Sequence, residues 1–212
     1  SLIEHISKGG PVMVPIFALA AAAILVALYK WYDLSKIKQP SPKEIDALLA
    51  SIAEHDKDKA LQQAGSITGP VGQMFTAGVE HINETRELIE EVLYESILTT
   101  RLKAQSLLPF IAISASSAPL LGLLGTVTGI INTFKLITVF GSGDVKTLSG
   151  GISEALITTK FGLVVAIPSL LLHAFLSRKA KGITDNMEKA AVAFVNQVSK
   201  TPYECPKKEA KK

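Results

Sequence analysis

The chain has 212 residues, of which 48% are hydrophobic but only 6% aromatic. The apolar residues gather in three blocks with charged segments between them, which is typical of a polytopic membrane protein rather than a soluble domain. The net charge of +3 is too small to indicate a nucleic-acid partner, and the single cysteine, Cys205, excludes an internal disulfide or a cysteine metal cluster.

The first apolar block, 11–29, is long enough at about 1.5 Å per residue to cross a bilayer. Tyr29 and Trp31 follow it, where a signal peptide would have small residues and a cleavage site. We therefore expect a retained transmembrane helix over 11–29, preceded by a short external segment over 1–10.

Residues 30–106 are more polar and are predicted to form helices outside the membrane. The stretch from Ser41 to Glu44 has the pattern of a capping box, with Pro42 at the first helical position. A break is expected at 65–70, because this segment holds two glycines and a proline. A further helix is expected to start near Glu84 and to run without interruption into the next apolar block.

The second apolar block covers 107–140 and the third covers 152–176. A polar turn is expected over 141–151. A helix with an apolar stripe is predicted over 177–200, and the basic end, 201–212, has the composition of a disordered tail.

Basic residues collect after the first block, before the second and after the third. The positive-inside rule then places residues 30–106 and 177–212 in the cytoplasm and the N-terminus outside. The sequence thus predicts an all-α fold with three transmembrane helices, of which the second and third project into a cytoplasmic helical bundle.

Three glycines of the second block, Gly122, Gly125 and Gly129, follow helical spacing and predict a groove for close packing of another helix. Thr126 lies beside this groove and could bond back to a carbonyl of its own helix. A phosphate-binding loop is excluded, because no strand precedes the segment and no Gly-Lys-Ser/Thr ends it.

The third block begins with four polar residues: Glu154, Thr158, Thr159 and Lys160. In an antiparallel helix pair, Thr126 and Thr159 would lie within about one helical turn in depth, with Glu154 one to two turns further outward. Polar groups at membrane depth usually face a bundle interior or a water-filled cavity, so these residues predict a graded polar path. Two alternatives stay open: a favourable helix-dipole position for Glu154, and back-bonding for Thr159.

Lys160 is the least expected of these residues, because an ammonium group within a span costs about 2.5 to 3.5 kcal/mol and cannot easily reach either surface here. It could form an ion pair with a carboxylate on a neighbouring helix. Alternatively, it could tune ion passage or, with Thr158, contact a partner helix. No motif of a hydrolase, metalloenzyme or cofactor site occurs, so neither an enzyme, a metal nor a cofactor is expected.

Two segments, "LGLLGTVTGIINTF" (121–134) and "ISEALITTKFGLVVAIPSLLLHAFLSR" (152–178), together resemble the ExbB/TolQ/MotA proton-channel family, and most of all its ExbB type. Weaker support comes from "KGGPVMVPIFAL" (8–19) and from the three-span layout. The resemblance implies a ring-forming homo-oligomer, typically a pentamer, in the bacterial inner membrane. Its N-terminus would be periplasmic and its C-terminus cytoplasmic.

The resemblance further implies that the ring surrounds an ExbD-like single-span subunit that carries a membrane aspartate. Proton flow would then drive a TonB-like protein and, through it, nutrient import across the outer membrane. The pore positions of the family fall on Thr126, Glu154 and Thr159. Lys160 departs from the family, in which this position is usually small or apolar. A closed ring would explain how such polar residues avoid contact with lipid.

Other functions fit parts of the same pattern. A TolQ-like motor for envelope maintenance has the same core, whereas MotA proteins have an extra span and a larger cytoplasmic insertion. A non-conducting membrane scaffold would use the glycines and polar residues for assembly alone. A small-solute carrier is disfavoured, because three spans without an internal repeat lack the usual two halves.

Overall fold

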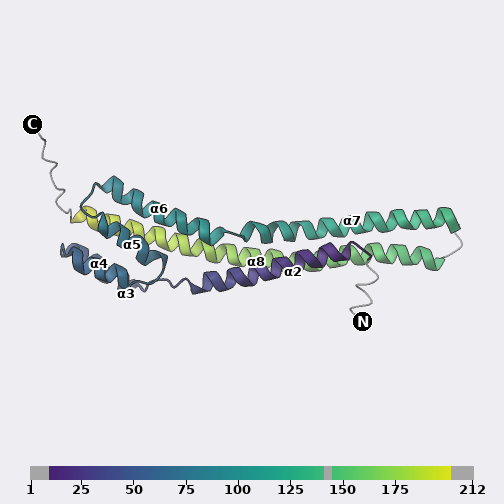
Figure 1. Cartoon of the computed structure of the whole chain (residues 1–212), viewed down its shortest axis with the longest axis horizontal. Coiled ribbons are helices and arrows are strands. Elements are labelled where there is room, and N and C mark those ends of the chain that lie inside the picture. The colour runs from purple at the N-terminus through teal and green to yellow at the C-terminus, as the bar shows by residue number, and fades with distance from the viewer. Residues whose placement is uncertain (1–9, 141–144, 202–212) are drawn as a thin grey trace, which may run out of the picture. The chain divides into compact units, whose positions relative to one another are not determined.

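The computed structural model describes residues 10–140 and 145–201, and within these ranges the chain is helical without any strand. The predicted all-α fold is therefore confirmed. The expected external segment over 1–9 and the expected tail over 202–212 lie outside the described residues. The helices, labelled in Figure 1, are α2 (Met13–Lys36), α3 (Pro42–Ala53), α4 (Lys57–Ser66), α5 (Pro70–Glu80), α6 (Arg86–Gln105), α7 (Leu108–Phe140) and α8 (Val145–Lys200).

The chain divides into two compact units. We call the first the membrane unit (residues 1–31 and 107–177) and the second the bundle unit (residues 32–106 and 178–212). Among the described residues, three helical stretches are long and apolar enough to cross a membrane, namely Met13–Lys36, Arg86–Val139 and Ser149–Lys200. This number agrees with the three predicted spans.

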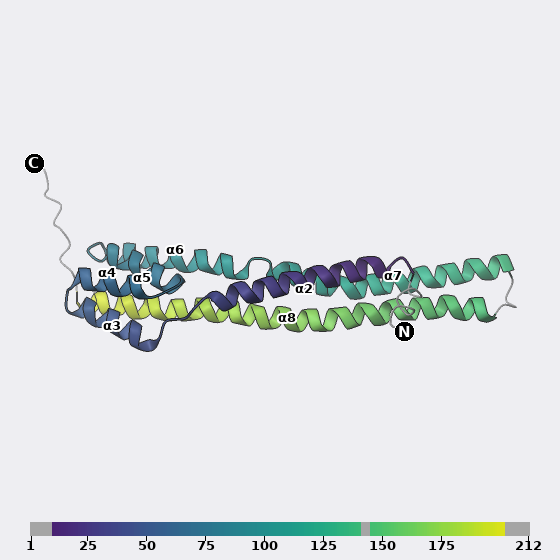
Figure 2. The same ribbon diagram turned by 60° about the horizontal axis from the view of Figure 1, so that its bottom comes forward.

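In the membrane unit, α7 and α8 lie side by side and antiparallel (Figures 1 and 2). A Cβ added at Gly129 would lie 2.8 Å from the Cβ of Ala155, and one at Gly162 would lie 2.7 Å from the carbonyl oxygen of Ala118. The two backbones approach this closely because each helix presents small residues at three- and four-residue spacing. This small-residue seam consists of Ala118, Gly122, Gly125, Gly129 and Thr133 on α7, and Gly151, Ala155, Thr158 and Gly162 on α8.

Helix α2 packs along α8 in the membrane unit with a constant register. The rings of Phe17 and Phe161 have centroids 5.8 Å apart, and those of Trp31 and Phe175 are 5.4 Å apart. In each pair the two residues are 144 positions apart in the sequence. The two helices therefore run parallel and advance by the same length per residue. Positions along α8 can therefore be assigned to levels along α2, whose apolar stretch begins at Pro11.

In the bundle unit, α3 to α6 pack against the C-terminal part of α8. Phe194 of α8 is fully buried and stacks on Phe75 of α5 with ring centroids 5.7 Å apart. Met187 lies in the helix predicted over 177–200 and is also fully buried, so the apolar stripe of that helix faces the core. The core of the unit is formed by Leu48, Ile52, Ala60, Ala64, Ile67, Val71, Met74, Phe75, Val79, Ile82, Ile89, Leu93, Ile97, Met187, Ala190, Ala191, Phe194 and Val195.

Two of the helix boundaries in the bundle unit follow their sequence signals. The backbone N–H of Ser41 donates to Oε2 of Glu44 at 2.7 Å, and α3 begins at Pro42 as predicted. The break expected at 65–70 falls between α4 and α5, where Gly69 has a φ of 96° that favours glycine.

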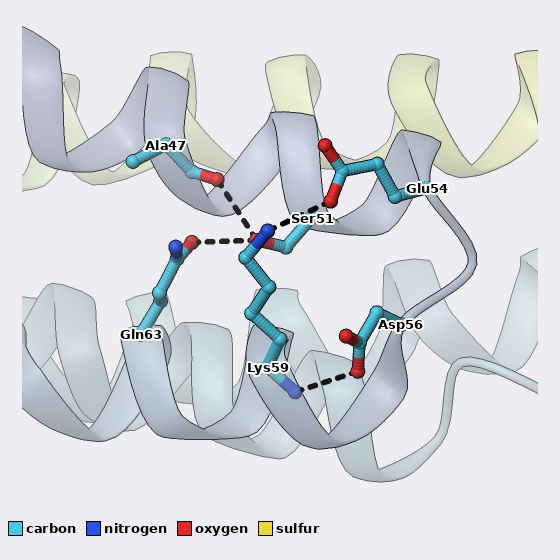
Figure 3. Close-up of polar contacts among 6 residues, drawn as sticks. All are labelled: Ala47, Ser51, Glu54, Asp56, Lys59 and Gln63. Atoms are coloured by element: carbon cyan, nitrogen blue, oxygen red, sulfur yellow. Dashed lines mark hydrogen bonds and ion pairs between the residues drawn. The ribbon is translucent and has the colours of Figure 1, made fainter.

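A second break, between α3 and α4, was not predicted. His55 takes a φ of 59° there, and Asp56 caps α4 by accepting a hydrogen bond from the backbone N–H of Lys59 at 2.9 Å. Ser51 then joins the two helices, because its hydroxyl donates to Oε1 of Gln63 at 2.9 Å (Figure 3). The pair is a tight helical hairpin that no glycine or proline announces in the sequence.

The expected continuous helix from Glu84 into the second block is wrong. Helix α6 ends at Gln105, and the chain turns through Ser106 and Leu107, whose φ is 66°, before α7 begins. Pro109 explains the interruption, because it has no N–H for the carbonyl of Gln105 and its ring would clash with that carbonyl.

Helix α8 is longer than the sequence suggested. One helix of 56 residues runs from Val145 to Lys200, which confirms that the third span projects into the helical bundle. The turn expected over 141–151 is wrong for residues 145–151, which are helical. Pro168 lies inside this helix without ending it. In an apolar environment no water is available to bond free backbone groups, and a continuous helix therefore remains favoured.

Candidate ion pathway in the membrane unit

Thr159 connects α8 to α7. Its hydroxyl donates to the carbonyl oxygen of Gly122 at 3.1 Å, so it makes an interhelical bond instead of the back-bond weighed from the sequence. The approach requires glycine at position 122, because a Cβ there would lie 3.0 Å from the Cα of Thr159. Thr159 itself is only half-buried within the chain.

Thr126 lies one turn further along α7 and is also half-buried. Its hydroxyl donates to the carbonyl oxygen of Leu123 at 2.6 Å, within its own helix. In an α-helix the backbone N–H of Thr126 bonds the carbonyl of Gly122, which is also the acceptor for Thr159. The two threonines are thus within about one helical turn in depth, as the sequence predicts. Each hydroxyl oxygen still has lone pairs to accept another hydrogen bond.

Thr158 is buried in the seam and has an exposed fraction of 1%. The Thr158 hydroxyl donates to the carbonyl oxygen of Ala155 at 2.8 Å. A Cβ added at Gly125 would lie 2.6 Å from the Cβ of Thr158. Thr158 is therefore a packing contact between two helices of one chain. The contact with a partner helix that the sequence allowed would require this seam to open.

Glu154 lies on a different side of α8. Its carboxylate occupies the space beside Gly10, at the start of α2, and these two residues are again 144 positions apart. Five residues along a helix correspond to about 140° of rotation, so Glu154 faces α2 while Thr159 faces α7. Within a single chain the structure places the two threonines at about the same depth but does not place Glu154 beside them.

Lys160 lies on the exposed face of α8 among apolar side chains such as Leu156 and Ile167, which are 64% and 59% exposed. In the part of the chain that the structure describes, it forms no ion pair. It is six residues, or about 9 Å, from the level of Glu154. Side chains on a helix lean toward its N-terminus, so the Lys160 ammonium group is directed toward the end of the span at which Glu154 lies. This direction shortens the path of the ammonium group to water.

The glycine spacing noted in the sequence predicts only the α7 half of the seam. On α8, Gly151 packs on Thr133 of α7, because a Cβ added at Gly151 would lie 3.3 Å from the Cβ of Thr133. Gly162 packs on Ala118 in the same way. The repeated small residues at three- and four-residue spacing in 151–162 would have predicted this half as well. No group of three metal-binding side chains occurs among the described residues.

Comparison with known proteins identifies the family. Residues 66–189, more than half of the chain, match the MotA/TolQ/ExbB proton channel family. The chain therefore belongs to this family, whose members are membrane proteins.

Individual relatives carry names from more than one branch. The chain is 32% identical over 140 residues to the Tol-Pal system protein TolQ of Pseudomonas aeruginosa, covering 59% of this chain and 61% of TolQ. It is also 32% identical over 182 residues to the putative biopolymer transport protein ExbB-like 1 of Synechocystis, covering 82% of this chain and 70% of that protein. The fold resembles the flagellar MotAB stator complex of Bacillus subtilis, with a TM-score of 0.64 at 17% identity over 93% of this chain and 80% of that one.

Proposed function

We propose that this chain is the ion-conducting subunit of a membrane energy converter, and that Thr126 and Thr159 line its ion path. The observation that supports this most strongly is the bond from Thr159 to Gly122, which holds one hydroxyl at the depth of the other. A hydroxyl oxygen with free lone pairs can accept a hydrogen bond from water that carries a proton, or can ligate a dehydrated cation. The family description supports the proton as the ion.

Glu154 is proposed to act at the rim of the same path. It lies at the level where the apolar stretch of α2 begins, about 7.5 Å along α8 from Thr159. A carboxylate at this level would attract cations before they enter the span. This assignment gives Glu154 a role that does not require contact with either threonine.

The path requires an assembly, because one chain provides only one side of it and because the exposed ammonium group of Lys160 would be unfavourable against acyl chains. We propose a homopentameric ring around an ExbD-like single-span subunit whose membrane aspartate accepts and releases the proton. The similarity of the fold to a stator complex supports an oligomer with a smaller partner. Lys160, on the exposed face of α8, would then lie against a neighbouring copy or the partner rather than acyl chains.

The energy is proposed to drive a TonB-like protein and thereby nutrient import across the outer membrane. The alternative is a TolQ-like motor that maintains the cell envelope, and the relatives carry both names. Either role is one of transport and mechanical work, and neither requires an enzymatic activity of this chain.

The location that fits this role is the bacterial inner membrane, with a periplasmic N-terminus and a cytoplasmic bundle unit. Basic residues support this orientation, because Lys36 and Lys38 follow the first span, and Arg178, Lys179 and Lys181 follow the third.

One observation favours a second function, that of a non-conducting scaffold. Both threonine hydroxyls already use their donor hydrogen within the chain, on Leu123 and on Gly122. If holding helices together were their only role, these residues would stabilise the ring without carrying ions.

The two functions differ in what happens when the hydroxyls are removed. Thr126→Ala and Thr159→Ala are expected to leave the oligomer assembled by native mass spectrometry but to abolish protonophore-sensitive uptake of an outer-membrane receptor ligand in cells. Normal uptake by both variants would refute the pathway, and disassembly of the ring would favour the scaffold. Purification with an aspartate-bearing single-span protein would support the converter.

A further inference from the structure

Gly10, the residue before the first turn of α2, has two independent reasons to be glycine. Its φ is 66°, in the region that side-chain-bearing residues seldom adopt. A Cβ at this position would also overlap Oε1 of Glu154 and would lie 3.0 Å from its Cδ and 3.6 Å from its Cγ. The carboxyl group of Glu154 therefore occupies the space that a side chain at position 10 would need.

Other glycines of this chain, such as Gly125 and Gly151, are also closely approached, but one glycine near Glu154 is not. A Cβ added at Gly150, which lies on α8 one turn before Glu154, would have no neighbour within 4 Å. The contact of Gly10 with Glu154 also continues the register of the Phe17–Phe161 and Trp31–Phe175 pairs. The packing of α2 along α8 thus places Gly10 next to the Glu154 carboxylate.

We propose that Gly10 is a positioning residue that seats the Glu154 carboxylate against the start of α2, at the rim of the span. This proposal rests on the role given to Glu154 in the proposed function. Any L-residue at position 10 would push the carboxylate out of this seat, away from α2. The flexible glutamate side chain would then sample other rotamers, and the rim would lose a fixed acceptor.

The seat itself can be tested without measuring ion transport. In a Cys205→Ser background, the pair Gly10→Cys and Glu154→Cys is expected to form an intrachain disulfide on mild oxidation, read by alkylation of free thiols and mass spectrometry. The control pair, Gly10→Cys with Lys160→Cys, is expected to stay reduced, because Lys160 is about 9 Å further along α8 and on its exposed face. Equal disulfide yields in the two pairs would contradict the proposed contact between Gly10 and Glu154.

The functional test uses the full chain in cells and the uptake assay described above. Gly10→Ala is expected to reduce protonophore-sensitive uptake at least about tenfold, because a displacement of about 1 Å is enough to disable a positioned group. Gly150→Ala is the control for added volume on α8 and is expected to transport normally. The double variant below controls for the backbone strain that any side chain meets at the positive φ of Gly10.

A compensating change separates positioning from general damage. Glu154→Asp withdraws the carboxylate by one methylene group and is expected to reduce uptake on its own. Combined with Gly10→Ala, whose methyl group fills the vacated space, it is expected to restore uptake to well above that of Gly10→Ala alone. No recovery in the double variant, or normal uptake by Gly10→Ala, would overturn the proposal. The proposed function would fail instead if uptake were normal in all three of the variants Thr126→Ala, Thr159→Ala and Glu154→Gln. The disulfide test would then still show whether Gly10 and Glu154 are in contact.

Discussion

The Thr159 hydroxyl and the Gly122 carbonyl, 3.1 Å apart, form a side-chain hydrogen bond across the small-residue seam between α8 and α7. The bond depends on the missing side chain of Gly122, since a Cβ there would lie 3.0 Å from the Cα of Thr159. Helix packing and the orientation of a polar group are therefore linked at this point. A change on either helix should affect both the stability of the pair and the polar path.

The first prediction separates the hydroxyl of Thr159 from its shape. Thr159→Val removes the bond to Gly122 but keeps the branched side chain, and should lower the free energy of unfolding by about 0.6 kcal/mol. Thr159→Ser keeps the hydroxyl and should retain energised uptake, whereas Thr159→Val should lose it. Thermal unfolding in detergent and uptake in cells measure the two effects. Full uptake by Thr159→Val would show that the hydroxyl carries no ion.

The second prediction exchanges a methyl group across the seam. Gly129→Ala would bring two Cβ atoms to 2.8 Å and should destabilise the protein by about 1 to 3 kcal/mol through overpacking. Ala155→Gly should cost about 1 kcal/mol through loss of helix propensity. The double variant restores the total volume and should be closer to the original chain in its thermal midpoint than Gly129→Ala. Additive effects of the two changes would contradict the packing described for the seam.

Much of this fold follows from local signals that the sequence displays. The three apolar stretches, the start of α3 at Pro42 and the glycines of α7 all lie where periodicity and capping chemistry place them. The interruption before α7 also had a signal in Pro109. The continuous hydrophobicity from residue 107 onward favours an uninterrupted helix and conceals this signal.

The remaining features depend on tertiary packing. His55 takes a positive φ without being glycine, so nothing local marks the hairpin between α3 and α4. The contact of Glu154 with Gly10 joins residues 144 positions apart, and only the register between α2 and α8 brings them together. Spacing on α8 places Glu154 outward from Thr159 and on a different face of the helix, but it does not show which helix each face contacts.

The third prediction concerns pH and the hairpin of the bundle unit. The Lys59 ammonium donates to Oε2 of Glu54 at 2.8 Å (Figure 3), and this bond raises the pKa of Lys59 above its ordinary value. A raised pKa means that the contribution of the pair to stability is fully present below the unfolded-state pKa and is lost as the pH rises through the folded-state pKa. Stability near neutral pH should therefore be insensitive to this titration.

NMR titration of the Lys59 side chain measures the effect directly. Glu54→Gln should lower the pKa of Lys59 toward its ordinary value, and Asp56→Asn should lower it less, because the Asp56 charge is the weaker cause. Added salt should reduce the shift as well, since the side chain is about half exposed to solvent. A larger effect of Asp56→Asn than of Glu54→Gln would contradict the geometry of the hairpin.

The last prediction uses the turn that ends α6. Leu107 is 45% exposed and has a φ of 66°, a conformation that costs a branched residue about 1 to 2 kcal/mol relative to glycine. Leu107→Gly removes this strain but makes the unfolded chain more flexible, so it should be neutral or stabilise the protein by up to about 1 kcal/mol. Leu102→Gly is the matched control, because Leu102 is 66% exposed but lies within α6, where glycine should destabilise by about 1 kcal/mol. Thermal unfolding of the two variants should therefore move in opposite directions or differ by about 1 kcal/mol or more. Equal destabilisation by both would mean that residue 107 is not held in the left-handed region.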